Sequence, residues 1–192
     1  MQAFFFYVRL NLETFSTLLR TWCTQLEEST DEKIAINAGE GVRSLEPRIT
    51  DIARHALPAL RLYSAWLLTN SQVLVSGLGD EAIVGLVKRF WSTYTDSLSI
   101  IARVFPVQRL PDVPYLLEED VDSIGFKPLQ SERSNKLWID ASSGVQKAKF
   151  SQSTRASLST EMLARVRELL VDGLILAVDK VCYVPSRCMN EG

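Results

Sequence analysis

The segment from Pro106 to Leu129 constrains the fold of this chain more than any other stretch. Its prolines exclude a continuous helix, because proline lacks the backbone N–H and its ring clashes with the preceding turn. The segment is nevertheless rich in apolar residues, namely Val107, Leu110, Val113, Tyr115, Leu116, Leu117, Val121, Ile124, Phe126 and Leu129. A solvated loop would leave this apolar surface in water. We therefore predict that the segment lies extended across a surface made by other elements.

Four further stretches repeat apolar residues with the 3.6-residue period of an amphipathic helix. They span about residues 3–28, 47–70, 81–105 and 159–182, with Asp80 and Ser159 as N-caps of the last two and a kink at Pro58. No stretch alternates convincingly as a strand does. The sequence predicts an all-α fold of antiparallel helical hairpins with the Pro-rich apolar segment packed across them. Residues 1–184 form one domain, and 185–192 are a frayed tail.

Residues 130–157 are Ser-rich and basic, which predicts a flexible loop. Cations bind backbone phosphate and aromatic faces stack on bases, so this composition suits single-stranded nucleic acid. The candidate binding residues are Lys127, Arg133, Lys136, Trp138, Lys147, Lys149 and Arg155. A solvated insertion has the same composition, so both interpretations stay open. Arg48, Arg54 and Arg61 form a possible second basic row on one helix.

An acidic cluster, Glu118, Glu119, Asp120 and Asp122, suits either a divalent metal or the first turn of a solvated helix. We favour the helix, because the carboxylates are adjacent in sequence and no partners stand out elsewhere. His55 is expected to be a half-buried structural residue, since no nucleophile motif accompanies it. No phosphate-cradling or dinucleotide motif is found. The sequence therefore predicts a non-enzyme without cofactor, metal or small-molecule substrate.

Composition sets the cellular context. The net charge of −2 provides no strong attraction of the whole molecule to nucleic acid or membrane, so such contacts require a local patch. Three scattered cysteines favour a reducing compartment over a disulfide framework. The apolar N-terminus lacks the preceding positive charge of a signal peptide, and no stretch is long and apolar enough to span a membrane. We expect the nucleus or cytoplasm.

Several motifs along the chain carry a resemblance to a known family. Leu57-Pro58-Ala59-Leu60-Arg61 with Trp66-Leu67 resembles the helix that opens the C-terminal helical region of the ever-shorter-telomeres/SMG family, and Phe90-Trp91 with Leu98 fits the next helix. Leu117-Glu118-Glu119-Asp120 with Gly125-Phe126-Lys127-Pro128-Leu129 is similar to the family's most recognisable segment. Glu161 to Arg167 resembles its closing helix in filamentous fungi. The resemblance covers about residues 33–184.

The resemblance implies a tetratricopeptide-like, DNA/RNA-binding helical domain of a factor in nonsense-mediated mRNA decay or telomerase recruitment. The implied partners are RNA or single-stranded telomeric DNA, and protein subunits of the decay or telomerase machinery. Leu-Glu-Glu-Asp replaces the Leu-Pro-Glu-Asp of many relatives, which favours a fungal type. The 14-3-3-like N-terminal half and the nuclease domain of some relatives are not found. We predict a non-catalytic nucleic-acid-binding adaptor; the alternative is a protein-interaction scaffold without nucleic-acid affinity. Convergence of the loop cations with an arginine row in one groove favours the adaptor, whereas scattered cations favour the scaffold.

Overall fold

The computed structural model describes residues 2–36, 45, 48–75, 81–131, 134–140, 142–151 and 153–179. Four long helices dominate these residues: α1 (Gln2–Ile36), α2 (Asp51–Val75), α3 (Glu81–Val104) and α5 (Leu158–Val178). Shorter elements lie between α3 and α5: η2 (Val107–Arg109), β1 (Tyr115–Leu116), α4 (Glu118–Ser123), η3 (Lys127–Leu129), η4 (Asn135–Leu137) and β2 (Ala148–Lys149). The predicted all-α class is confirmed.

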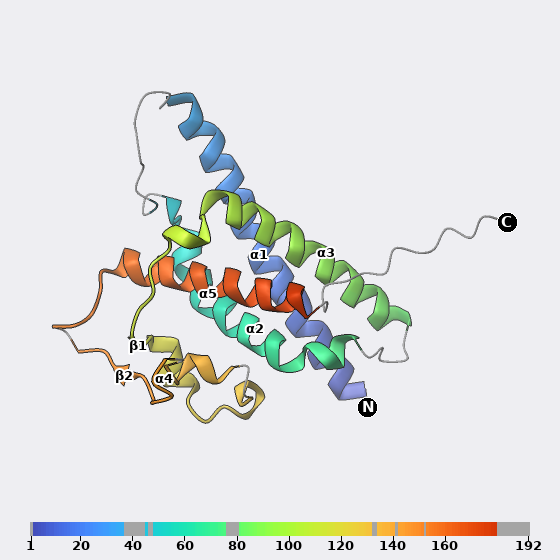
Figure 1. Ribbon diagram of the computed structural model, residues 1–192. Helices are drawn as coiled ribbons and strands as arrows, with labels where there is room; N and C mark the ends of the chain where they lie inside the picture. Colours follow the sequence, from blue (N-terminus) through green and yellow to red (C-terminus); the bar gives the residue numbers. More distant parts are fainter. Residues whose placement is uncertain are drawn as a thin grey trace.

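The most extensive helix–helix contacts join elements that are not consecutive, since α1 packs on α3 and α2 packs on α5 (Figure 1). One large apolar core links the four long helices. Its centre is an aromatic cluster in which the Phe15 ring stacks on Tyr63 at 5.4 Å and meets the Phe90 ring at 5.8 Å between ring centroids. The apolar stripes read from the sequence therefore meet one another, as helix amphipathicity requires.

The helix limits differ from those predicted in several places, among them α2, which spans Asp51–Val75 and not residues 47–70. Helix α1 continues to Ile36, beyond the expected limit near residue 28. Helix α5 is capped by Ser157, whose hydroxyl oxygen accepts the Thr160 backbone N–H at 3.1 Å, so the prediction of Ser159 as the cap is wrong. Helix α2 runs through Pro58. The proposed N-cap Asp80 lies outside the described residues.

The Pro-rich segment packs across the helices as predicted. Leu110 joins the main core, whereas Val113, Tyr115 and Leu117 form a second apolar cluster with Ala164 of α5. Strand β1 pairs in parallel with β2, placing Tyr115 opposite Ala148 and Leu116 opposite Lys149. Figure 1 shows the short elements gathered beside one end of the α2–α5 layer. A two-residue strand carries no alternation that the sequence could reveal.

The described part of residues 130–157 is anchored at several points. Leu137 is 1% exposed and packs with Leu129 and with Ala65 of α2. The Lys147 backbone N–H donates to the Trp138 carbonyl at 2.7 Å. The flexibility of this loop stays a prediction, as does the division into residues 1–184 and a tail. Residues 185–192 and Arg133 lie outside the described residues.

Candidate nucleic-acid interface

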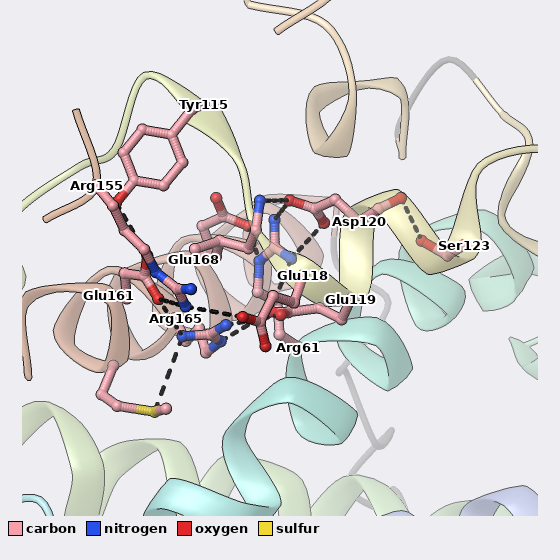
Figure 2. A network of polar contacts seen from close by, with 12 residues as sticks. Arg61, Tyr115, Glu118, Glu119, Asp120, Ser123, Arg155, Glu161, Arg165 and Glu168 are labelled. Atoms are coloured by element: carbon pink, nitrogen blue, oxygen red, sulfur yellow. Dashed lines mark hydrogen bonds and ion pairs between the residues drawn. The ribbon is translucent and has the colours of Figure 1, made fainter. Parts of the chain in front are cut away.

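A buried ion network joins α4 to α2 and α5 (Figure 2). Arg61 of α2 is its centre. The guanidinium donates from Nη2 to Asp120 Oδ2 at 3.0 Å and from Nη1 to Glu119 Oε1 at 3.1 Å. It also bonds Glu168 of α5 through Nε. Arg61 is 1% exposed, Asp120 0% and Glu119 8%. Burial of these charges is tolerated because each is paired and hydrogen-bonded.

A second arginine extends the network along α5. Arg165 donates from Nε and Nη2 to the two carboxylate oxygens of Glu119, at 2.8 and 2.7 Å. This two-pronged geometry is the strong form of an arginine–carboxylate contact. Glu161, one turn earlier, accepts the Tyr115 hydroxyl at 3.0 Å and the Arg155 Nε at 2.9 Å. The network therefore holds both Tyr115 of β1 and the following helix α4 against α5.

The pKa shifts follow from burial and the two arginines. Burial raises the pKa of Glu119, but Arg165 and Arg61 outweigh it, so the net pKa is lowered. Glu168 has a lowered pKa for the same reason, with Arg61 as its main partner. Burial raises the pKa of Asp120 although Arg61 opposes the shift. The arginines thus hold Glu119 and Glu168 ionised at neutral pH.

These contacts correct several sequence predictions. Glu119 and Asp120 are not on a solvated face, whereas Glu118 and Asp122 are exposed. Charged residues of an amphipathic helix are expected to face solvent, but Glu161, Arg165 and Asp172 of α5 are buried. His55 is exposed instead of half-buried. Within the described residues, no group of three or more His, Cys, Asp or Glu side chains is arranged to hold a metal ion.

Three of the proposed nucleic-acid-binding residues have partners within the protein. Lys136 forms an ion pair with Asp172 of α5. The Trp138 indole N–H donates to the Asp120 carbonyl at 3.0 Å. Arg155 pairs with Glu118 and Glu161, and its guanidinium lies 4.4 Å from the centre of the Phe150 ring. Lys136, Trp138 and Arg155 therefore contribute to the fold, and the Phe150 ring of the same loop contacts Arg155 and Tyr115.

A groove of about 480 Å³ separates the loop from α5. Three cations line it, Lys136 and Lys147 from the loop and Arg167 from α5, together with the three carboxylates of Asp112, Asp140 and Glu168. Burial lowers the pKa of Lys136, and the nearby Arg61, Lys147 and Arg167 charges act in the same direction, whereas Glu168 opposes it. Arg167 pairs with the exposed Asp112 at 3.1 Å across the groove. Among the described residues, Lys147 has no ion-pair partner, so it is the groove cation most available to an external anion.

The remaining candidates do not line this groove. Lys127 of η3 and Lys149 of β2 are exposed and have no ion-pair partner within the described residues. The arginine row is not a surface feature, because Arg61 is buried and Arg48 donates to the Val104 carbonyl at 2.7 Å. Arg167 was missed because an arginine on a helix gives no signal of what faces it. Of the described loop cations, Lys136 and Lys147 thus converge with an arginine in the groove, whereas Lys149 does not.

A second groove, of about 370 Å³, lies between α1 and α3. Arg20 and Arg89 line it with Ser16, Thr17 and Thr93, and Glu13 at its edge accepts a hydrogen bond from Arg9 at 2.9 Å. Its aromatic residue, Phe90, is only 2% exposed. This groove presents cations and hydroxyls but no ring face to which a base could stack.

These features define an α-helical domain with local cationic surfaces on a chain of slightly negative net charge. The family model described as the Est1 DNA/RNA binding domain matches residues 2–133. The chain therefore belongs to the Est1 DNA/RNA-binding domain family. The match includes α1, which the sequence resemblance left out, and ends before α5. No curated protein and no solved structure matches the chain. None of the helices that the structure describes is both long and apolar enough to cross a membrane.

Proposed function

We propose that this chain is a non-catalytic, nucleic-acid-binding adaptor of the Est1/SMG type, acting in nonsense-mediated mRNA decay or telomere maintenance. Family membership supports a nucleic-acid-binding role. The observation that carries the proposal is the groove in which Lys136, Lys147 and Arg167 converge, with Lys147 unpaired among the described residues. Because Lys136 and Arg167 are paired with Asp172 and Asp112, Lys147 is the groove cation that would bind a phosphate of the nucleic-acid backbone, a contact that does not read sequence.

The non-catalytic assignment rests on the state of the acidic side chains. Glu119, Asp120, Glu161 and Glu168 all bind arginine, so within the described residues these carboxylates are occupied by guanidinium groups. A general base or metal ligand needs a carboxylate free to take a proton or a cation. We further propose a nuclear or cytoplasmic location, a fungal type of the family and tetratricopeptide-like helical hairpins, which follow from the sequence resemblance.

A protein-interaction scaffold is the second candidate function. It is favoured by the internal pairing of Lys136 and Arg155, which leaves fewer free cations than the sequence suggested. In this case the exposed helix faces would dock subunits of the decay or telomerase machinery, and the groove would have no affinity for RNA or DNA.

Fluorescence anisotropy with labelled single-stranded RNA and G-rich single-stranded DNA, over a salt series, distinguishes the two functions. Each phosphate that the protein binds predicts a contribution of about −0.7 to the slope of log affinity against log salt. Replacing Lys147 and Lys149 by Ala should weaken binding and reduce the slope by about 0.7 for each phosphate that the variant no longer binds. Lys88→Ala is the matched control, because Lys88 is exposed on α3 and does not line the groove. Absence of binding by folded protein at low salt would contradict the adaptor and leave the scaffold.

A further inference from the structure

The groove does not contain the whole interface that the family match implies. Lys136, Lys147 and Arg167 all follow residue 133, where the match ends. A nucleic-acid contact shared by the family must therefore include residues within 2–133. The described part of that range exposes three aromatic side chains, Phe6, Tyr7 and Phe126, at 62%, 60% and 56%.

These aromatic residues differ in the cation beside them. Arg9, the cation nearest in sequence to Phe6 and Tyr7, is paired with Glu13 at 2.9 Å. Lys127 follows Phe126 directly, is exposed, and has no ion-pair partner within the described residues. Phe126–Lys127 is thus the place in the described part of 2–133 where an exposed ring adjoins an unpaired cation. Single-stranded nucleic acid is bound by this combination, a ring for a base and a cation for the adjacent phosphate.

We propose that Phe126 and Lys127 form a base-stacking contact for single-stranded nucleic acid, in which the Phe126 ring receives one base and Lys127 its neighbouring phosphate. The inference rests on the proposed function and adds to it a residue that contacts a base instead of the phosphate backbone. Phe126 takes the place of Trp138 as the candidate stacking ring, because the Trp138 indole N–H and the Phe150 ring contact other groups of the protein.

The structure holds this turn in place from both sides. On one side the Phe126 N–H donates to the Ser123 carbonyl at 3.0 Å, and the Ser123 hydroxyl donates to the Asp120 carbonyl at 3.2 Å. On the other, the Leu129 N–H donates to the Phe126 carbonyl at 3.0 Å. Asp120 is fixed by Arg61, and Leu129 is 3% exposed. A ring presented by a fixed backbone loses little conformational entropy when a base stacks on it.

Gly125 gives the turn its direction. Its φ of 82° lies in the left-handed region, and a Cβ added there would meet no atom within 4 Å. The turn therefore borders open space at Gly125, next to the exposed Phe126 ring. Ile124 is also exposed, at 46%, but an aliphatic side chain offers no flat face for stacking.

The test is anisotropy with a single-stranded RNA and with a matched oligonucleotide that carries abasic positions. Phe126→Ala should weaken binding of the normal RNA about fivefold or more, as removal of one base stack does, with the salt slope unchanged. Lys127→Ala should weaken binding and reduce the slope by about 0.7. Phe126→Trp should retain the affinity. Phe6→Ala, which removes an equally exposed ring from α1, is the matched control and should bind as wild type does.

The outcomes separate the two proposals. If Lys147→Ala weakens binding and Phe126→Ala does not, the stacking contact is wrong and the proposed function stands, with Phe126 left to contact a protein. Equal affinity of wild type for normal and abasic oligonucleotides also overturns the stacking contact. If wild-type protein binds neither RNA nor DNA, both proposals fail together. Circular dichroism of each variant establishes that the helices are intact.

Discussion

Arg61 of α2 and Asp120 of α4, which lie 59 residues apart in the sequence, form a two-pronged ion pair with Nη2 3.0 Å from Oδ2 and both side chains buried. Arg61 also holds Glu119 and Glu168. One side chain of α2 therefore neutralises carboxylates from both α4 and α5. The position of the short helix α4, and of the turn that follows it, depends on this arginine.

Arg61→Met should destabilise the protein by about 3–5 kcal/mol, because it removes the cation and leaves buried carboxylates uncompensated. Arg54→Met is the matched control. Arg54 is on the same helix, is exposed, and pairs with the exposed Asp51 at 3.8 Å, so its loss should cost less than about 0.5 kcal/mol. Urea unfolding followed by circular dichroism measures both. Equal costs would show that the buried network does not hold the fold.

The cost of Arg61→Met should shrink as pH falls. In wild type the pKa values of Glu119 and Glu168 are below the ordinary 4.5, so their stabilisation is complete above about pH 4.5 and is lost as pH falls through the lowered values. Without Arg61, Glu119 keeps Arg165, but Glu168 loses its main partner and burial raises its pKa, so protonation of Glu168 stabilises the variant as pH falls. The difference in unfolding free energy between pH 7 and pH 4 measures this. If the free-energy difference between wild type and Arg61→Met were the same at pH 7 and pH 4, the ionised state of Glu119 and Glu168 would be contradicted.

Tyr115→Phe should cost about 1–2 kcal/mol and loosen β1. The Tyr115 hydroxyl donates to Glu161 at 3.0 Å and accepts the Ala156 N–H at 2.9 Å, so the change leaves two polar groups without this partner. Tyr7→Phe alters a hydroxyl on a side chain that is 60% exposed and should be neutral. Hydrogen exchange at Tyr115 and Ala148 should rise in the first variant alone.

Gly173→Ala should destabilise the protein by about 1–3 kcal/mol, despite the better helix propensity of alanine. Gly173 is buried where α5 approaches α3, and an added Cβ would overlap the Leu98 Cδ1 atom and lie 3.5 Å from the Tyr94 hydroxyl. Leu98→Ala should remove the overlap, so the double variant should be more stable than the sum of the two single changes predicts. Strict additivity in thermal unfolding would rule out this overlap.

Alkaline pH should weaken the fold through Cys23. Burial raises the pKa of its thiol from 9.0 to about 11, with the Glu27 charge acting in the same direction. The unfolded thiol loses its proton first, so stability should fall as pH rises from about 9 to about 11, by roughly 2–3 kcal/mol. Cys23→Ala removes this contribution. Urea unfolding of both proteins at pH 8 and pH 10.5 should show the larger loss in wild type.

The sequence predicted the long helices because their apolar residues repeat locally. It did not predict the ion network, because a charged residue in a helical pattern was assigned to solvent. One local signal was available for Arg61. Its neighbours one turn away on either side, Leu57 and Ala65, are apolar and fully buried, which places position 61 on the inner face. The identity of its partners depends on contacts across 58 to 107 residues, which no local pattern encodes.

The candidate site was predicted in part for a related reason. The Ser-rich loop made Lys136, Lys147 and Arg155 candidates, and the structure places Lys136 and Lys147 at the groove, but composition could not show that Lys136 and Arg155 are paired within the protein. Phe126 was counted with the apolar residues that pack on the helices. It is exposed in the folded turn, directly after Gly125 with its positive φ, and the apolar pattern of the sequence does not show this.

The parallel pairing of β1 with β2 brings residues 116 and 148 to neighbouring positions. The chain between them packs on α2 through α4, Leu129 and Leu137 before it returns to β1. Its tip, at residues 142–146, is exposed throughout. Relatives should therefore be able to lengthen, shorten or exchange this tip over evolutionary time while the four long helices keep their places, and an epitope tag inserted there should leave the helices undisturbed.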